Sequence, residues 1–340
     1  MAWRRHCVTQ GDKMKAIVYT KYGPPDVLHL EEVEKPAPKD NEVLIKVYAT
    51  TVTTGDVNAR GFVFVPRGFG FVSRLMFGLV KPKKTILGVE FAGEIEATGK
   101  DVTLFQKGDQ VFGIDGAVLG AYAEYKCMPE TGGLAIKPAK LTYEEAAVIP
   151  NGALTALTFL RNLGNIQRGQ KILINGASGS VGSAAIQIAK YFGAEVTGVC
   201  SAANMELVKS LGADQVIDYT RQDFTNSDET YDIIFDTVGK TSFSGCKNAL
   251  KQKGLYLAGA GGLREFGQMA WTLTGGKKVI AGASSERTED LIFIKKLAEM
   301  GKIKPVIDRR YPLEQTADAH RYVDNGHKKG NVVITITGKE

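Results

Sequence analysis

The chain has 340 residues, of which 44% are hydrophobic and 24% charged. This length fits two domains of ordinary size, and the composition is that of an average globular protein. No apolar run reaches the length of about eighteen residues that a membrane-spanning helix needs, so we do not expect an integral membrane protein. The net charge of +6 is modest and lies partly in WRRHC near the start and KPKK at 81–84. A nucleic-acid binder concentrates more charge on one face, so we expect no nucleic-acid partner.

The four cysteines lie far apart in the sequence, and no C-x-x-C pair is present. This spacing disfavours a disulfide framework and a structural zinc knuckle, and it indicates a cytoplasmic or other reducing compartment. The residues before Met14 lack the apolar core of a secretory signal. We therefore expect residues 1–13 to form a flexible extension ahead of the folded chain.

From Met14 to about Pro138 the sequence is a succession of short runs, rich in β-branched residues or alternating in polarity, with Gly, Pro and Asp between them. Such runs predict the strands of an antiparallel, barrel-like module. The runs are KAIVYT, EVLIKVYATTV, EFAGEIEATG, DQVFGI and AYAEYKCMP. The aromatic-rich segment from Gly61 to Lys84 fits no strand rhythm. It is open to three interpretations: a substrate lid, a membrane-surface patch, or a loop packed on the core.

After Pro138 the rhythm changes to alternating strands and helices, which predicts a parallel sheet covered by helices. The strand runs are KILING, AEVTGVC, QVIDY, YDIIFDTVG, GLYLAGA and KKVIAGA. The tail from about residue 305 returns to strand, helix and strand. The fold class predicted is therefore α/β, with residues 138–299 forming a Rossmann domain. Residues 14–137 and 300–340 together are expected to form a discontinuous, mainly β domain.

The stretch INGASGSVG, residues 174–182, spaces three glycines as G-x-x-G-x-x-G, which alone is weak evidence for a ligand. Here the glycines stand between the apolar strand KILIN and a run of apolar residues with helical spacing. At such a turn free N–H groups and the positive end of the helix dipole face outward, and absent side chains let a pyrophosphate approach. The sequence predicts a dinucleotide site containing Gly176, Ser178, Gly179, Ser180, Val181 and Gly182.

The residues after the next strand bear on which dinucleotide binds. An NAD site usually has Asp or Glu at the end of the second strand, where it holds the ribose hydroxyls. Here AEVTGVC is followed by Ser201, Ala202 and Ala203, so no carboxylate stands there to repel a 2′-phosphate. Ser201, Asn204 and Tyr219 are candidate contacts for that phosphate. We therefore expect NADPH in preference to NADH.

Taken together, these motifs resemble the medium-chain dehydrogenase/reductase superfamily, and within it the zinc-free quinone oxidoreductase branch that includes zeta-crystallin. The resemblance covers nearly the whole chain from Met14 on. Its motifs are MKAIVYTKYGPPDVLHLEEV, GVEFAGEIEATGKDV, FQKGDQVFG, AYAEY, INGASGSVG and LGADQVIDY. It implies a GroES-like catalytic domain, a Rossmann domain, a cleft between them for nicotinamide and substrate, and commonly a homodimer.

The resemblance also bears on zinc. Zinc-dependent members of the superfamily carry a Cys near Thr53 or Thr54, a Gly-His-Glu where this chain has Gly88-Val89-Glu90, and a second Cys near Asn151. Thr, Val and Asn do not supply the required ligands, so we expect no metal. Without a Lewis acid the acceptor must already be electron-deficient. This favours a quinone or an α,β-unsaturated carbonyl such as an enone or 2-alkenal.

Site residues follow from the resemblance, position by position. ATTVTTGDVNARG is similar to the family's cleft segment, which makes Thr53, Asp56 and Arg60 candidate catalytic residues. Asn58 stands where some members have Tyr, which removes the most obvious proton donor. Further cofactor contacts are implied at Asn151 and Thr155, and after the fourth and fifth strands at Thr237, Val238, Gly239, Ala258 and Gly259. In GHKKGNVVI, Asn331 replaces a family Lys, and Lys329 is a candidate phosphate contact.

Three functions remain open at this point. The first is an NADPH-dependent quinone or 2-alkenal reductase. The second is a reductase of the same fold that acts on one particular enone, with the phenylalanines of residues 61–84 shaping the substrate pocket. The third is an NADPH-binding sensor, attached to a membrane surface or RNA through its basic clusters and with little turnover.

Overall fold

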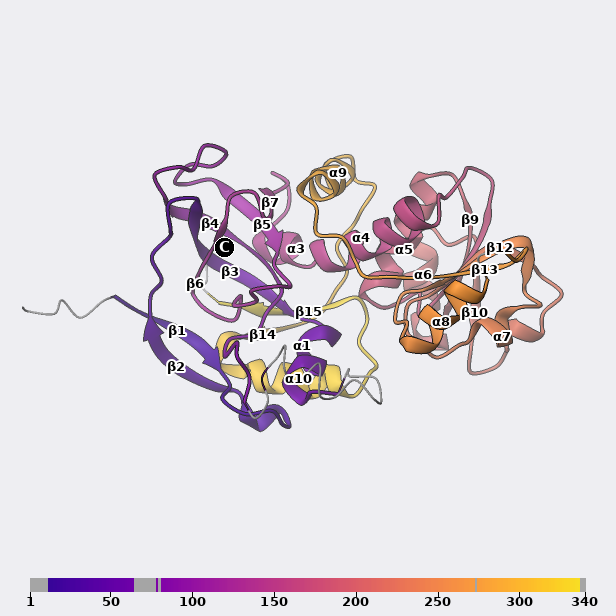
Figure 1. Ribbon diagram of the computed structural model, residues 1–340, viewed down its shortest axis with the longest axis horizontal. Helices are drawn as coiled ribbons and strands as arrows, with labels where there is room; N and C mark the ends of the chain where they lie inside the picture. Colours follow the sequence, from indigo (N-terminus) through magenta and orange to yellow (C-terminus); the bar gives the residue numbers. More distant parts are fainter. Residues whose placement is uncertain (1–11, 64–77, 79–80, 273, 337–340) are drawn as a thin grey trace, which may run out of the picture.

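Two sheets of different construction organise the chain (Figure 1). The computed structural model describes residues 12–63, 78, 81–272 and 274–336. One sheet is mainly antiparallel and has the strand order β14-β15-β3-β4-β5-β7, with β6 paired to β3. Its strands are β3 (Glu42–Val52), β4 (Glu90–Thr98), β5 (Gln110–Ile114), β6 (Tyr125–Pro129), β7 (Gly133–Ile136), β14 (Ile307–Pro312) and β15 (Asn331–Thr335). A separate antiparallel pair, β1 (Lys13–Val18) and β2 (His29–Glu34), lies beside it.

The second sheet is parallel throughout and has the order β10-β9-β8-β11-β12-β13. Its strands are β8 (Lys171–Asn175), β9 (Glu195–Cys200), β10 (Gln215–Asp218), β11 (Tyr231–Asp236), β12 (Leu250–Ala258) and β13 (Lys278–Ala281). β8, the first strand in sequence, lies inside the sheet, and the chain continues on both sides of it. Parallel sheets of this kind bind ligands outside the carboxyl ends of their strands, near the point where the strand order reverses.

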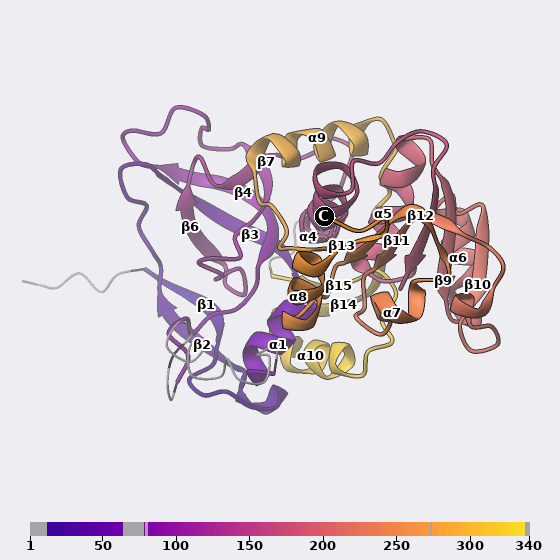
Figure 2. The same cartoon turned by 45° about the vertical axis from the view of Figure 1, so that its right-hand side comes forward.

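The helices join and cover the two sheets. They are α1 (Thr54–Gly61), α3 (Tyr143–Ala147), α4 (Pro150–Leu157), α5 (Ser180–Tyr191), α6 (Met205–Ser210), α7 (Phe243–Cys246), α8 (Leu263–Trp271), α9 (Thr288–Glu299) and α10 (Thr316–Asp324). In Figures 1 and 2, α4 lies between the two sheets, next to α5. The largest buried cluster includes residues of both sheets and of α4 and α5, so one continuous core joins them. None of the helices described is long and apolar enough to cross a membrane.

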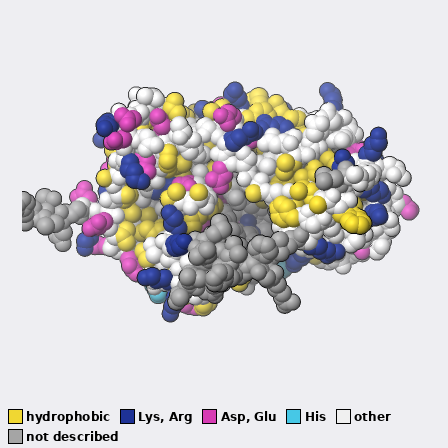
Figure 3. Space-filling model, viewed as in Figure 1, with side chains coloured by type: hydrophobic (Ala, Val, Ile, Leu, Met, Phe, Trp, Pro, Cys, Tyr) yellow, Lys and Arg dark blue, Asp and Glu magenta, His cyan; other side chains and the backbone are white. Residues whose placement is uncertain are grey.

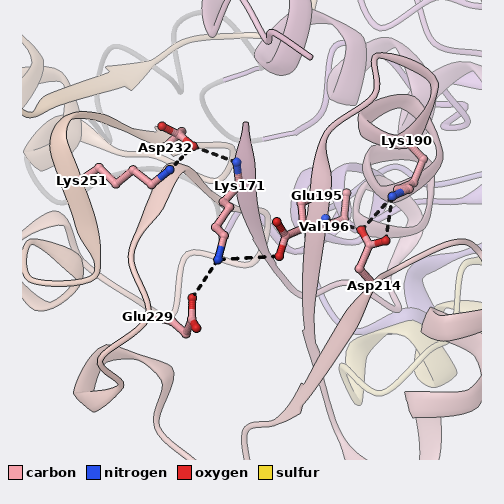
Figure 4. A network of polar contacts seen from close by, with 8 residues as sticks. All are labelled: Lys171, Lys190, Glu195, Val196, Asp214, Glu229, Asp232 and Lys251. Atoms are coloured by element: carbon pink, nitrogen blue, oxygen red, sulfur yellow. Dashed lines mark hydrogen bonds and ion pairs between the residues drawn. The ribbon is translucent and has the colours of Figure 1, made fainter. Parts of the chain in front are cut away.

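The amino edge of the parallel sheet is closed by charged side chains (Figure 4). An oxygen of Asp232 accepts hydrogen bonds from the Lys171 backbone N–H at 2.8 Å and from the Lys251 ammonium at 2.7 Å. Asp214 accepts in the same way from the Val196 N–H at 2.7 Å. These hydrogen bonds occupy backbone N–H groups at the starts of β8 and β9. A ligand is therefore expected at the opposite edge, where the parallel strands end.

The fold class predicted from the sequence is confirmed: the parallel strands and the mainly antiparallel strands occur where their runs were expected. Two strands were missed. All but one residue of β2 are exposed, so its sequence shows no alternation, and β7 is a short run that begins at a glycine. AYAEYKCMP forms a strand only over its second half. Most of the Gly61 to Lys84 segment, and residues 1–11, lie outside the described residues.

Candidate functional site

The glycine turn joins the end of β8 to the start of α5. Gly176 has φ +80°, in the left-handed region that favours glycine, and its N–H and that of Ala177 both donate to the Val199 carbonyl. Gly179 is the N-cap of α5, and no side chain caps that helix. The first N–H groups of α5, those of Ser180, Val181 and Gly182, have no acceptor within the helix. The turn thus presents unpaired donors at the positive end of a helix, which suits an anion.

The three glycines differ in what a side chain would meet. A Cβ on Gly182 would lie 2.1 Å from the Gly176 carbonyl oxygen, and one on Gly176 would lie 2.6 Å from the Thr237 and Val238 side chains. A Cβ on Gly179 meets nothing closer than 3.4 Å. Gly176 and Gly182 therefore serve the packing of the turn. Gly179 leaves space open in front of it.

The polar groups beside the turn include two buried atoms without partners. Asn204, which follows β9, donates through Nδ2 to the Ser178 hydroxyl oxygen at 3.0 Å. Within the described part of the chain, the Asn204 Oδ1 and the Ser180 Oγ are buried and make no hydrogen bond. Ser201 begins the same loop without using its side chain as a cap, and Tyr219 lies next to it, 56% exposed. A polar ligand at this edge would satisfy atoms that otherwise remain unpaired.

The loops after β11 and β12 complete the carboxyl edge. The Thr237 hydroxyl donates to the Asn175 carbonyl at 2.8 Å, which fastens this loop to the end of β8. The Asp236 carboxylate accepts from the backbone N–H groups of Val238 and Gly239 at 3.1 and 3.0 Å. Gly259, directly after Ala258, has no room for a Cβ, which would lie 2.8 Å from the Phe235 ring. These predicted cofactor residues therefore lie at one edge with the glycine turn.

The start of α4 lies against the first residue of β4. The Asn151 backbone N–H donates to Glu90 at 2.7 Å, and the Thr155 hydroxyl donates to the Asn151 carbonyl at 2.7 Å. Glu90 is fully buried and also accepts from the Thr51 hydroxyl at 2.5 Å. Burial raises the pKa of Glu90 to about 7, against the lowering effect of these donors. Sequence reasoning did not select Glu90, because its sequence shows only one of three glutamates in β4 and not that this one is fully buried.

The loop before β15 reaches the glycine turn from the other sheet. The Gly330 N–H donates to the Ser178 carbonyl at 2.7 Å. The Lys328 ammonium donates to the Gly330 carbonyl at 2.6 Å, whereas Lys329 is exposed. Burial lowers the pKa of Lys328 to about 8, and the negative charges of Glu90 and Asp308 oppose that shift. The lysine beside the turn is therefore Lys328, one residue before the lysine that the sequence resemblance indicated.

Thr53 and Asp56 form a capping box at the start of α1. The Thr53 hydroxyl donates to Asp56 Oδ2 at 2.6 Å and accepts from the Asp56 N–H at 3.1 Å. The other carboxylate oxygen of Asp56 accepts from the Gly88 N–H at 3.0 Å. Asp56 is 1% exposed, and burial raises its pKa. These two predicted residues are brought together, and their contacts within the protein fix the first turn of α1.

Arg60, the third predicted catalytic residue, is part of a buried polar chain. Its guanidinium pairs with Asp324 at 2.9 Å and contacts His320 Nδ1 at 3.0 Å. Because arginine only donates, Nδ1 is the acceptor, and Nε2–H of the neutral imidazole donates to the Tyr122 hydroxyl at 3.1 Å. Tyr122 in turn donates to Asp56. Burial, with the charge of Arg60, lowers the pKa of His320 to about 3. Sequence reasoning missed His320 and Tyr122 because they are distant in sequence from Arg60.

The positions at or near which the sequence resemblance implies zinc ligands in zinc-dependent members are occupied here by Thr53, Thr54, Val89 and Asn151. Among the described residues, no group of three or more His, Cys, Asp or Glu side chains is arranged to hold a metal ion. The three cysteines in this part of the chain, Cys127, Cys200 and Cys246, are all free thiols.

Comparison with known proteins gives matches over most of the chain. The alcohol dehydrogenase GroES-like domain family matches residues 39–138, and the zinc-binding dehydrogenase family matches residues 211–334. A 2-methylene-furan-3-one reductase of Solanum lycopersicum is 34% identical, covering 95% of this chain and 79% of that protein. An NADPH-dependent alkenal/one oxidoreductase of Arabidopsis thaliana is 32% identical with the same coverage. The structure of a quinone oxidoreductase from Coxiella burnetii is similar with a TM-score of 0.85 at 30% identity, covering 96% of this chain and 100% of that one.

The parallel sheet with its glycine turn, set beside a GroES-like sheet, defines an NAD(P)H-dependent oxidoreductase. More narrowly, the chain belongs to the medium-chain dehydrogenase/reductase superfamily, in the branch of quinone oxidoreductases and alkenal/one oxidoreductases. The resemblance read from the sequence motifs is thereby confirmed.

Proposed function

We propose that this protein is a zinc-independent, NADPH-dependent reductase that transfers hydride to a quinone or to an α,β-unsaturated carbonyl. The observation that carries the proposal is the carboxyl edge of the parallel sheet. This edge contains the open space in front of Gly179 and the unpaired first N–H groups of α5. It also contains two buried polar atoms without a hydrogen-bond partner among the described residues, Asn204 Oδ1 and Ser180 Oγ. These groups suit a pyrophosphate and the sugar attached to it. The names of the tomato and Arabidopsis relatives support the acceptor class.

The residues present fit NADPH in separate ways. The backbone of residues 179–182 would hold the pyrophosphate. Ser201 and Asn204 would face the 2′-phosphate, because no carboxylate follows β9. Thr155 donates its proton to Asn151, so its hydroxyl oxygen is left as an acceptor for the carboxamide N–H of the nicotinamide. Once bound, the nicotinamide supplies a hydride from C4.

The chain's contribution to the reaction is positioning. The Thr53–Asp56 capping box and the Arg60–His320–Tyr122 chain hold α1 and the Gly88 backbone in fixed places. In this proposal Asp56 and Arg60 are positioning residues, since their polar atoms are engaged inside the protein. The Thr53 hydroxyl already donates to Asp56, so the proton that follows the hydride comes from elsewhere. Orientation and exclusion of water then provide most of the rate increase.

The test is NADPH consumption by the purified protein, offered in parallel a quinone, a 2-alkenal, and a simple alcohol with NADP. Turnover with either of the first two and none with the alcohol is the expected result. NADPH binding without turnover on any acceptor would contradict the reductase assignment. It would favour the alternative of a cofactor-binding sensor.

A further inference from the structure

The carboxylate of Asp236 receives hydrogen bonds from both neighbouring strands and from the loop that follows its own strand. Asp236 is the last residue of β11 and is 1% exposed. In the sheet it lies opposite Asn175, the last residue of β8, and opposite Ala258 at the end of β12. It therefore stands inside the carboxyl edge, next to the strand that leads into the glycine turn.

Each oxygen of this carboxylate accepts three hydrogen bonds. Oδ1 accepts from the Asn175 side-chain amide at 3.1 Å and from the backbone N–H groups of Val238 and Gly239 at 3.1 and 3.0 Å. Oδ2 accepts from the N–H and the hydroxyl of Thr241 at 3.0 and 2.7 Å, and from the Tyr256 hydroxyl on β12 at 3.0 Å. Hydrogen bonds to a carboxylate are among the strong ones, so these contacts fix the shape of the loop.

The loop of residues 237–241 thereby turns its backbone N–H groups toward the sheet. The Thr237 N–H donates to the Asn175 carbonyl at 3.1 Å, and the N–H groups of Val238, Gly239 and Thr241 are bonded to the carboxylate. Within the described part of the chain, the carbonyl oxygens of residues 237–239 accept no hydrogen bond, and Val238 and Gly239 are exposed. The loop therefore offers a ligand acceptors in place of donors.

The glycine turn beside this loop has the opposite polarity. Its N–H groups at the start of α5 have no acceptor within the helix. Free N–H groups attract phosphate oxygens, whereas free carbonyl oxygens repel them and accept hydrogen bonds from hydroxyl groups. The Thr237 hydroxyl, bonded to the Asn175 carbonyl at 2.8 Å, keeps the two surfaces in a fixed relation. A dinucleotide carries both kinds of group, since hydroxyl-bearing sugars flank its pyrophosphate.

We propose that Asp236 is a positioning residue for the dinucleotide. By holding the N–H groups of residues 237–241 inward, it presents the loop's carbonyl oxygens to sugar hydroxyls and confines the phosphates to the glycine turn. This inference rests on the proposed function for the presence of NADPH, and goes beyond it by naming the residue that aligns the cofactor along the edge. Asp236 is buried and acts through Val238 and Gly239. Because the loop is held in shape before binding, little further ordering of its backbone is required.

The test is fluorescence titration of NADPH into intact Asp236→Asn protein, which gives both the Kd and the number of binding sites per chain. The amide has a single acceptor oxygen and turns an NH2 group toward the loop's donors, so the loop loses its fixed shape. We expect the Kd for NADPH to rise about tenfold. A merely structural role would instead lower the melting temperature and the number of sites, with the Kd of the folded fraction unchanged.

Asp232→Asn is the matched control. Asp232 lies on the same strand at the opposite edge of the sheet, where it accepts from the Lys171 N–H and from the Lys251 ammonium (Figure 4). This change removes a comparable set of hydrogen bonds far from the loop. It should lower the melting temperature and leave the Kd for NADPH within about twofold of the native value.

Thr241 provides a second test that leaves the carboxylate in place. Thr241→Val removes the hydroxyl that donates to Asp236 and keeps the shape of the side chain, so the Kd for NADPH should rise about threefold. Thr241→Ser retains the hydroxyl and should retain the native Kd. These two variants decide the question if Asp236→Asn does not fold.

Two outcomes would overturn the inference while leaving the proposed function intact. The first is a native Kd for NADPH in folded Asp236→Asn, or in Thr241→Val where Asp236→Asn does not fold. The second is an equal rise of the Kd in Asp232→Asn, which would show that lost stability alone weakens binding. Failure of the native protein to bind either NADPH or NADH would instead overturn the proposed function, and with it the cofactor that Asp236 is proposed to position.

Discussion

Gly179 and Gly182 look equivalent in the sequence, but the structure assigns them different tasks. A Cβ on Gly182 would lie 2.1 Å from a backbone oxygen, so Gly182→Ala should destabilise the protein by about 2 kcal/mol or more. Gly179→Ala should fold with little change, because its Cβ meets nothing closer than 3.4 Å, and yet should weaken NADPH binding at least about tenfold. Urea unfolding and NADPH fluorescence titration measure the two effects.

Gly179→Asp extends this comparison, because it places a carboxylate against the pyrophosphate and should abolish binding. Unaltered NADPH affinity in a folded Gly179→Asp protein would contradict the assignment of the turn. Equal losses of stability in Gly179→Ala and Gly182→Ala would contradict the difference in packing.

His320 gives a prediction for acid conditions. Its pKa is lowered from 6.5 to about 3 in the folded protein, so folding favours the neutral ring. The stability that His320 contributes is therefore fully present above pH 6.5 and is lost as pH falls from there toward 3. Between pH 7.5 and 5.5 this loss amounts to about 1.4 kcal/mol.

His320→Gln keeps a neutral donor and acceptor at that place but cannot titrate. The free energy of unfolding of this variant, measured in urea at both pH values, should fall by about 1.4 kcal/mol less than that of the native protein. The same decrease in both proteins would show that His320 is not the group responsible.

At the residue scale, the glycine turn could be predicted because its signal is local: a strand, three glycines and a helix within about twenty residues. Glu90, Lys328 and His320 could not. Glu90 and His320 depend on partners far away in the sequence, such as Asn151 for Glu90 and Arg60 for His320. Lys328 lies in a loop whose Gly330 contacts Ser178 of the distant glycine turn. Thr53 and Asp56 form an intermediate case, since T-x-x-D is itself a local helix-cap pattern.

Among the structural elements, the loop that leads into β15 carries the contact with the glycine turn. Gly330 has φ +55°, and a Cβ there would lie 2.4 Å from the Val306 carbonyl oxygen. Gly330→Ala should therefore displace this loop, lower stability by about 1–3 kcal/mol and weaken NADPH binding. Gly326→Ala is the matched control for the backbone conformation, because Gly326 has φ +74° but open space around it. Similar NADPH affinities in the two variants would show that the Gly330 contact does not support the site.

For the whole molecule, the absence of zinc remains a prediction from the donor set. Reductase activity should be unchanged after treatment with a chelator, and metal analysis should find far less than one zinc per chain. Activity that disappears with chelator and returns with zinc would contradict the mechanism, because Thr53, Val89 and Asn151 would then not be the relevant positions.

A homodimer is also expected for the whole molecule. The exposed apolar side chains of α8, Trp271 at 88% and Phe266 at 46%, lie next to β13, the edge strand of the parallel sheet. Figure 3 shows hydrophobic side chains gathered on this side of the molecule. Trp271→Glu should shift the mass in sedimentation from about twice 36.7 kDa to one chain. Lys253→Glu, an exposed change on β12, is the charge control; a monomeric native protein would refute the expectation.

The placement of β15 has a consequence for synthesis. Residues 49–52 of β3 pair with β15, whose residues are synthesised only after all strands of the parallel sheet. A growing chain therefore carries part of β3 as an open edge throughout that interval, and open strand edges invite pairing with other chains. The parallel sheet contains all its own strands and can assemble while the earlier sheet waits for its last member. Nascent chains interrupted before residue 331 should thus be the species that most need a chaperone.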